Sequence, residues 1–344
     1  MDLRTGQRLH DPSDLDLDLR ILALRPNGHG TFQARFSDGH EATYSEAQIL
    51  ADALAPPGWQ DCPEPQLWTA RLTDLPRARW SATAASAQRE RWLEQFLRLG
   101  FIILSGVPTE PGSVLKIAAA FGFVRDTNFG ALFDVRSVPE ATDLAYTPVP
   151  LEPHTDNPYR TPVPGVQLLH CLVNETRGGL STLVDGFAAA TALRERDGEA
   201  FDILTRTSLR FCYRDATTEL TASGPPIELA VTGALQAIHF SPRLDFVPLA
   251  PPAALQRYYR ARRQFDRLLR SEEFEIRFLL GGGDLVMFDN RRLLHGRTGF
   301  NPHEGLRHLQ GCYIDIDAPR SEYRVLRRAR QAAPTPVPAR AMEK

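Results

Sequence analysis

Cysteine is scarce in this chain: its 344 residues include only four cysteines, at positions 62, 171, 212 and 312. They are widely separated, with no CxxC pair and no zinc-finger spacing, so the sequence lacks the framework of a disulfide scaffold or a zinc module. This usage is typical of reduced, mostly buried thiols, and we expect a cytoplasmic protein.

An excess of charge of one sign and long apolar runs are also missing. The formal net charge is −2, which argues against a general nucleic-acid or membrane-surface role. No apolar run approaches the roughly 20 residues that a membrane-spanning helix needs. The first residues, MDLRTGQRLHDPSDLD, are polar and acidic, unlike a signal peptide. We therefore expect neither a nucleic-acid nor a membrane partner.

The chain does have the length and apolar content for a large core. With 42% hydrophobic residues, it can form one large domain, alone or with a small companion. The alternating segment TFQARFSDGHEATYS predicts a β-hairpin, and a proline-rich linker follows it. We predict a small β-rich domain with its linker at 1–66, a main domain at 67–330 and a disordered tail at 331–344.

The main domain is predicted to be mainly β with flanking helices. Residues 86–100 and 111–122 have helical spacing and stop signals, and 101–107 is an apolar strand between them. From residue 165 onward, short β-rich segments separated by turns predict many strands, interrupted by one helix near 253–270. This pattern indicates two packed sheets, as in a β-sandwich, a barrel or a jelly roll of the cupin type.

The segment EPHTDNPYR contains the first candidate site. His154 and Asp156 are two residues apart, so on an extended backbone their side chains point to the same side. They could bind one metal ion together, or they could form an ordinary salt bridge or hydrogen-bonded pair. A jelly roll would favour the metal, because its mouth is lined by inward-facing side chains from several strands, and a third ligand should then be a distant histidine.

Most other histidines have ordinary structural interpretations. Each can be a hydrogen-bonded core residue, a solvated loop residue or a strand residue on the face opposite Arg307. These are His170 and His239 in apolar strands, His303 in a loop, and His308 beside Arg307.

His295 remains, at a strand end in the segment LLHGR. His154, Asp156 and His295 together match the two-histidine-one-carboxylate triad that binds Fe(II) and leaves three coordination positions open. A bidentate acid such as 2-oxoglutarate, together with O2, could bind at this open face. We therefore expect an iron-dependent oxygenase site.

The distal carboxylate of 2-oxoglutarate would need a fixed cation, ideally an arginine that binds it in a bidentate manner. Arg307 lies twelve residues after His295, where the predicted strand RHLQGCYIDID begins. We expect Arg307 to be this anchor, although a surface arginine on a strand is the alternative. Arg297 is the next candidate for the role.

Three segments together resemble a known family: HTDNPYRTPVPGVQLLHCLVNETRGGLSTLVDGF, FDNRRLLHGRTGF and RHLQGCYIDID. They are similar to the gamma-butyrobetaine hydroxylase group of Fe(II)/2-oxoglutarate dioxygenases, in the TauD/TfdA-type superfamily, over roughly residues 71–328. The resemblance implies a double-stranded β-helix core and the cofactors Fe(II), 2-oxoglutarate and O2, with ascorbate as a candidate reductant. It also implies that His154, Asp156 and His295 bind iron, that Arg307 anchors 2-oxoglutarate, and that Leu169 and Ser181 lie near the co-substrate.

The same resemblance implies an aromatic cage for a quaternary ammonium group, held by cation–π attraction in a desolvated pocket. The corresponding positions here are Phe129, Phe133, Tyr146 and Tyr313, each of which could otherwise be an ordinary core residue. Asn157 and Tyr159, which follow Asp156, could hydrogen-bond the anionic end of a zwitterionic substrate.

The chain also departs from the family pattern. No cysteine accompanies His40 in the N-terminal hairpin, so we expect no structural zinc. Asp143 replaces a usual asparagine, and Ser241 and Arg243 lie where an asparagine-rich stretch is usual. Asp143 would repel an anionic substrate unless Arg243 or Arg160 compensates, so the identity of the substrate stays open.

The predicted function is hydroxylation of an aliphatic carbon in a small betaine-like metabolite, such as gamma-butyrobetaine or trimethylaminoethylphosphonate. Three alternatives remain: the same chemistry on another amine or amino-acid-like metabolite, a zinc hydrolase using the same ligands, and a catalytically silent protein of this fold. The expected partner is a small molecule, and we expect a homodimer.

Overall fold

The computed structural model describes residues 2, 4–5, 7–9, 11–47, 49–50, 62–136 and 149–332. Contacts within the chain divide it into two units, Met1–Asp61 and Cys62–Lys344. The predicted tail, from residue 333 onward, lies outside the described residues, and the predicted domain boundaries stay a prediction.

The N-terminal unit contains a three-stranded antiparallel sheet in the order β1-β2-β3. The turn between its last two strands includes Gly39, whose φ of +86° favours glycine and whose N–H donates to the carbonyl of Phe36. Alternating apolar and polar residues predicted this hairpin, because an antiparallel sheet with one face in solvent has polar side chains on that face and apolar ones on the other. Its elements are the 3-10 helix η1 (Pro12–Asp14), β1 (Ile21–Pro26), β2 (Thr31–Phe36) and β3 (Glu41–Ser45).

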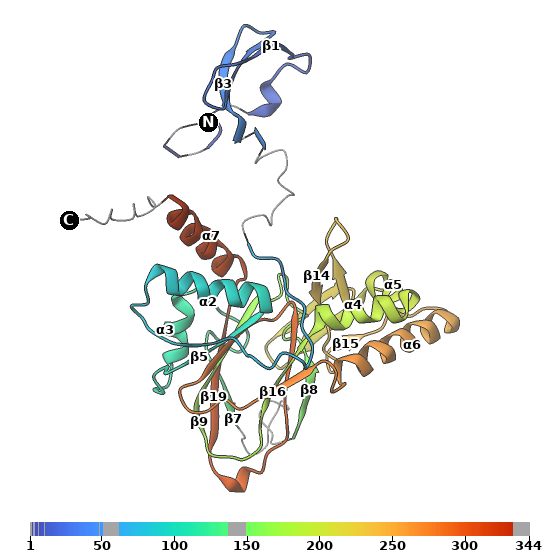
Figure 1. Cartoon of the computed structure of the whole chain (residues 1–344). Helices are drawn as coiled ribbons and strands as arrows, with labels where there is room; N and C mark the ends of the chain where they lie inside the picture. Colours follow the sequence, from blue (N-terminus) through green and yellow to red (C-terminus); the bar gives the residue numbers. More distant parts are fainter. Residues whose placement is uncertain are drawn as a thin grey trace, which may run out of the picture. The chain divides into compact units, whose positions relative to one another are not determined.

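The larger unit is built on two β-sheets (Figure 1). One has the order β4-β5-β17-β9-β19-β6, with β7 also paired to β19, and the other has the order β16-β10-β18-β8. The strands of the first are β4 (Arg77–Arg79), β5 (Phe101–Ser105), β6 (Val124–Arg125), β7 (Phe133–Arg136), β9 (Val166–Asn174), β17 (Leu285–Asp289) and β19 (Arg307–Ile314), and those of the second are β8 (Leu151–His154), β10 (Ser181–Asp185), β16 (Glu275–Phe278) and β18 (Leu293–Arg297).

The chain passes repeatedly from one sheet to the other: β9 and β17 lie in the first, whereas β10 and β18, which follow them, lie in the second. One apolar cluster joins the sheets, since it combines Phe288 and Leu309 of the first with Leu183 and Leu293 of the second. This alternation confirms the predicted double-stranded β-helix core with flanking helices.

Helices cover the outer faces of this core, with α2, α3 and α7 on one flank and α4, α5 and α6 on the other (Figure 1). Gly100 caps the C-terminus of α2: its φ of +82° is left-handed, and its N–H donates to the carbonyl of Phe96. The helices are α2 (Ser86–Leu99), α3 (Ser113–Ala119), α4 (Gly186–Arg196), α5 (Gly198–Arg206), α6 (Pro252–Leu269) and α7 (Asp317–Ala332), with the 3-10 helix η3 at Pro302–Glu304.

Two small antiparallel sheets lie between α5 and α6 in the sequence, in the orders β12-β11-β15 and β13-β14. Apolar residues of β11, β13 and β14 pack with α4, α5 and α6 in one cluster, so these sheets extend the helical flank. The strands are β11 (Leu209–Arg214), β12 (Glu219–Gly224), β13 (Ile227–Leu229), β14 (Leu235–Ile238) and β15 (Asp245–Phe246).

Candidate active site

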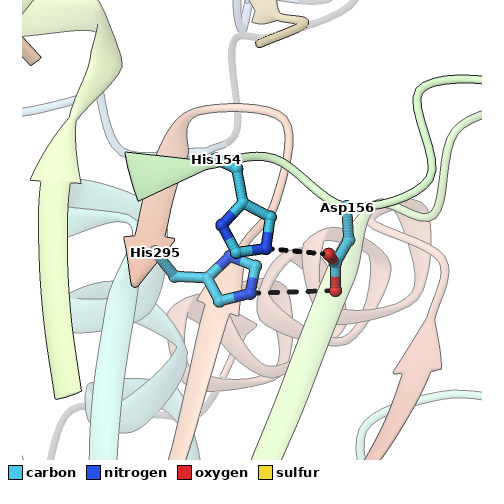
Figure 2. A group of neighbouring side chains, drawn as sticks. All are labelled: His154, Asp156 and His295. Carbon is cyan, nitrogen blue, oxygen red and sulfur yellow. Dashed lines mark ion pairs between the residues drawn. The ribbon is translucent and has the colours of Figure 1, made fainter. Parts of the chain in front are cut away.

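The two candidate histidine ligands lie on neighbouring strands. β8 ends at His154, and β18 places His295 directly opposite it in the antiparallel register. Their ring centroids are 4.4 Å apart. Asp156 follows β8 by two residues and turns its carboxylate toward both imidazoles (Figure 2). Sheet pairing thus brings together side chains that the sequence separates.

The three side chains have the geometry of a metal site. The Nε2 atom of His154 lies 3.4 Å from Oδ1 of Asp156, and that of His295 lies 3.8 Å from Oδ2. One potential ligand atom from each residue falls within 4.8 Å of the others, and among the described residues no other group of three or more meets this criterion. Two imidazoles and one carboxylate on one side of an ion suit Fe(II).

The electrostatics of the site favour the forms that bind metal. Burial opposes ionisation of Asp156, yet His295, His154 and the hydroxyl of Tyr313 together lower the pKa of its carboxyl group. Burial, with the neighbouring His154, lowers the pKa of His295 to about 3. At neutral pH the carboxylate is therefore charged and the His295 imidazole neutral, as ligation requires.

Hydrogen bonds orient the first two residues of the His-Thr-Asp segment. Nδ1 of His154 lies 2.9 Å from the carbonyl of Glu152, which directs Nε2 toward the site. Thr155 is 1% exposed, its N–H donates to the carbonyl of Phe240, and its hydroxyl accepts from the N–H of Phe240. The threonine between the two ligands thus fixes the segment to the chain that follows β14.

A pocket of about 390 Å³ opens beside the triad. Every predicted site residue that the structure describes lines it, from strands of both sheets and the loops beside them. These residues are Phe129, Phe133, His154, Asp156, Asn157, Tyr159, Leu169, Ser181, Ser241, Arg243, His295, Arg307 and Tyr313. Asp143 and Tyr146 lie outside the described residues.

Two buried arginines line one part of the pocket. Arg307, the first residue of β19, is 8% exposed, and Arg297 is 5% exposed. Both guanidinium groups lie over the ring of Phe300, at 5.3 and 4.9 Å from its centroid. Burial lowers the pKa of Arg307, and burial together with Arg307 lowers that of Arg297 to about 10. Both stay cationic at neutral pH.

The geometry around Arg307 depends on a glycine of the GGLST segment. Arg307 donates through Nη2 to the carbonyl of Gly179 at 3.2 Å. A Cβ atom on Gly179 would lie 2.7 Å from Nε of Arg307, and the φ of this residue is +67°, so a side chain there would displace the guanidinium. No described carboxylate forms an ion pair with Arg307, and its Nε is buried without a hydrogen-bond partner.

Aromatic rings line another part of the pocket. Phe129 contacts Tyr213 edge to face at 5.6 Å, and Tyr213 stacks on Tyr159 at 5.2 Å. Phe133 contacts Tyr313 at 5.2 Å. Tyr213 was not predicted from the sequence, and the alternation in SLRFCYRD, which marks a strand, was the one signal that could have indicated it.

Two predicted pocket tyrosines use their hydroxyl groups inside the protein. Tyr313 donates to Oδ2 of Asp156 at 2.7 Å, so it contacts a candidate metal ligand as well as the pocket. Tyr159 donates to Oδ1 of Asn157 at 2.6 Å, and burial followed by the charge of Asp156 raises its pKa. Asn157 has a φ of +54°, a left-handed conformation that asparagine tolerates.

The other described histidines of the main unit lie away from the triad. His170 is fully buried, as predicted, but neither ring nitrogen has a hydrogen-bond partner, and burial lowers its pKa to about 4. The predicted hydrogen bond is therefore absent among the described residues. His239 pairs with a glutamate, Glu228, at 2.8 Å. His308 pairs with Asp134, which lines the pocket, and His303 is exposed.

Residues 65–313 match the family model described as "Taurine catabolism dioxygenase TauD, TfdA family". The chain belongs to the TauD/TfdA dioxygenase family. The prediction of an iron- and 2-oxoglutarate-dependent oxygenase is thereby confirmed, with His154, Asp156 and His295 able to hold the metal.

Relatives within this dioxygenase family span most of the chain. A gamma-butyrobetaine dioxygenase from Pseudomonas sp. (strain AK-1) is 36% identical over 94% of this chain and 86% of its own length. The gamma-butyrobetaine dioxygenase of Homo sapiens is 34% identical over 77% of this chain and 70% of its own length.

The structure of an asparagine oxygenase in complex with Fe(II), 3-hydroxyasparagine and succinate has a TM-score of 0.53. It covers 66% of this chain and 79% of its own, at 19% identity, so it supports the fold alone. None of the described helices is long and apolar enough to cross a membrane.

Proposed function

We propose that this TauD/TfdA family member hydroxylates an aliphatic carbon of a small betaine-like metabolite. The observation that carries the proposal is the arrangement of one pocket, in which the triad, a buried arginine without a described acidic partner, and aromatic walls all meet. The relatives named gamma-butyrobetaine dioxygenase support the substrate class.

In this proposal the metal ligands are His154, Asp156 and His295. The donor set fits Fe(II), since both imidazoles present Nε2 and the carboxylate is ionised at neutral pH. When bound, iron with 2-oxoglutarate and O2 would supply the oxidising chemistry: one oxygen atom would enter a C–H bond of the substrate, and the other would enter succinate as 2-oxoglutarate loses carbon dioxide. The contribution of the protein is to hold the ligands and to orient the substrate in the pocket beside them.

Arg307 anchors the distal carboxylate of 2-oxoglutarate in this proposal. Arg307 is 8% exposed, and its Nε is buried without a hydrogen-bond partner, which is a costly arrangement unless an anion joins it. Leu169 and Ser181 line the same pocket and would contact the carbon chain of the co-substrate. The guanidinium of Arg297, which also lies over the ring of Phe300, adds positive charge nearby.

The cationic end of the substrate would contact the aromatic walls, namely Phe129, Tyr213, Phe133 and Tyr313. A trimethylammonium group makes no strong hydrogen bonds, so ring faces attract it through cation–π interaction. Asn157, Ser241 and Arg243 would face the anionic end, with Arg243 exposed at the rim of the pocket. Since Tyr159 already donates to Asn157, we assign it the role of orienting that amide.

The test is succinate release and product analysis over a panel of substrates: gamma-butyrobetaine, trimethyllysine, trimethylaminoethylphosphonate, and the dimethylamine and neutral tert-butyl analogue of each. We expect a trimethylammonium compound to be hydroxylated at a carbon between its charged ends. Equal turnover of the neutral analogue would contradict the cationic substrate class and leave the iron chemistry intact. The homodimer and the cytoplasmic location remain predictions, tested by sedimentation and by cell fractionation.

A further inference from the structure

Asn290 lies at the turn between β17 and β18, and its side chain is fully buried. Its Oδ1 accepts a hydrogen bond from the N–H of Asp156 at 2.8 Å. Its Nδ2 donates to the carbonyl of Asp156 at 3.0 Å. One side-chain amide therefore bonds to both main-chain groups of a candidate metal ligand.

This double contact constrains the direction of the Asp156 side chain. The N–H belongs to the peptide plane before its Cα atom, and the carbonyl belongs to the plane after it. Holding both planes against one rigid amide fixes φ and ψ of Asp156, and with them the direction of its Cα–Cβ bond. The contact thus sets the direction in which the Asp156 side chain leaves the backbone, whereas the Tyr313 hydroxyl fixes the position of one carboxylate oxygen.

Asn290 also fixes the segment to the rest of the core. Its Nδ2 donates to the carbonyl of Pro164 at 3.0 Å, and its main-chain N–H donates to the carbonyl of Gly165 at 3.0 Å. These two residues lead into β9. Arg292, in the same turn as Asn290, forms a buried ion pair with Asp185 at 2.7 Å and so fixes this turn.

The position of Asn290 in the chain joins the two ligand-bearing segments. It lies five residues before His295 and bonds to Asp156 across 134 residues of sequence. The residue after Asp156, Asn157, has a left-handed φ of +54°, a conformation that asparagine tolerates and that surrounding contacts stabilise. The Asn290 amide supplies such contacts one peptide away.

We propose that Asn290 is a positioning residue of the metal site, which sets the carboxylate of Asp156 against the two imidazoles. The inference rests on the proposed ligand set. The competing role is purely structural, in which Asn290 ties β17 to the start of β9 and its loss only lowers stability.

Metal binding by the full-length apo-protein separates the two roles. Mn(II) is titrated anaerobically, with free Mn(II) followed by electron paramagnetic resonance and without 2-oxoglutarate. Groups that orient metal ligands typically change metal affinity by about 10- to 100-fold when removed, and we expect Asn290→Ala to weaken Mn(II) binding within that range.

Asn174→Ala is the matched control. Its amide donates to the carbonyl of Leu280 at 3.1 Å and accepts from Thr176, so it is a similar side-chain clamp at the far end of β9. We expect it to lower the thermal midpoint as Asn290→Ala does while leaving Mn(II) affinity within about twofold of the wild type. An unchanged affinity in Asn290→Ala would overturn the proposal.

Asn290→Asp decides the matter if the alanine variant does not fold. It preserves shape and the bond accepted from Asp156, but it loses both donated bonds and places a carboxylate oxygen against two carbonyl groups. We expect a folded protein with weakened Mn(II) binding, and affinity equal to the wild type would contradict the proposal. If the wild type itself bound no Mn(II), the proposed metal site and this inference would both be overturned. If the wild type and the Asn290 variants bound Mn(II) equally well, only this inference would be overturned and the metal site would stand.

Discussion

The metal end of the pocket and its aromatic walls are built in different ways. At the metal end, His154, Thr155 and Asp156 each have directed hydrogen bonds to other residues. At the walls, the side chains of Phe129 and Phe133 have no hydrogen-bonding groups and pack against other rings. Directed bonds fix one geometry, whereas ring contacts tolerate changes of shape. The metal site can therefore keep one geometry while the residues that line the substrate site vary.

Removing a ligand should break the metal end completely. Asp156→Ala deletes the only carboxylate of the triad, and we expect no Fe(II) binding and no succinate formation from 2-oxoglutarate. His154→Ala should do the same. Asp202→Ala, which removes an exposed carboxylate from α5, is the control and should retain full activity. Near-native succinate release by the Asp156 variant would show that the triad is wrongly assigned.

Arg307→Ala tests the proposed anchor of 2-oxoglutarate. Iron should still bind, but the 2-oxoglutarate requirement should rise by roughly two to four decades, because losing one partner of a buried charge pair costs about 3–5 kcal/mol. The measurement is the 2-oxoglutarate dependence of succinate formation, with Arg277→Ala, an exposed arginine of β16, as control. An unchanged dependence would transfer the anchor role to Arg297.

Tyr313→Phe separates the two functions of one side chain. The variant keeps the ring that contacts Phe133 and loses the hydroxyl that donates to Asp156. We expect Fe(II) affinity to fall by about tenfold, within the range for groups that orient ligands, while the KM for a cationic substrate stays nearly constant. If the KM rose and metal affinity held, the hydroxyl would serve the substrate instead.

The metal end was also the more predictable of the two from sequence. His154 and Asp156 are two residues apart, so the alternation of an extended chain already places them together. His295 followed from its place at a strand end. The role of Asn290 depends instead on strand pairing across the fold, which no local pattern encodes, and Tyr213 had only the alternation of SLRFCYRD as a signal. The hydroxyl of Tyr313 was missed for the same reason, since an aromatic in a strand predicts burial and says nothing about its hydrogen-bond partner.

Phe129→Leu should have the smallest effect and bears on the walls alone. Leucine keeps the apolar surface but removes the ring face, whose attraction for a cation is about 1 kcal/mol at a partly exposed site. We expect the KM for a trimethylammonium substrate to rise by about fivefold, with the turnover of its neutral tert-butyl analogue and the affinity for Fe(II) unchanged. Tyr259→Leu, which removes an aromatic that is 49% exposed on α6, is the matched control. An equal loss for charged and neutral substrates would show that Phe129 only fills space, and the walls would then select by shape without regard to charge.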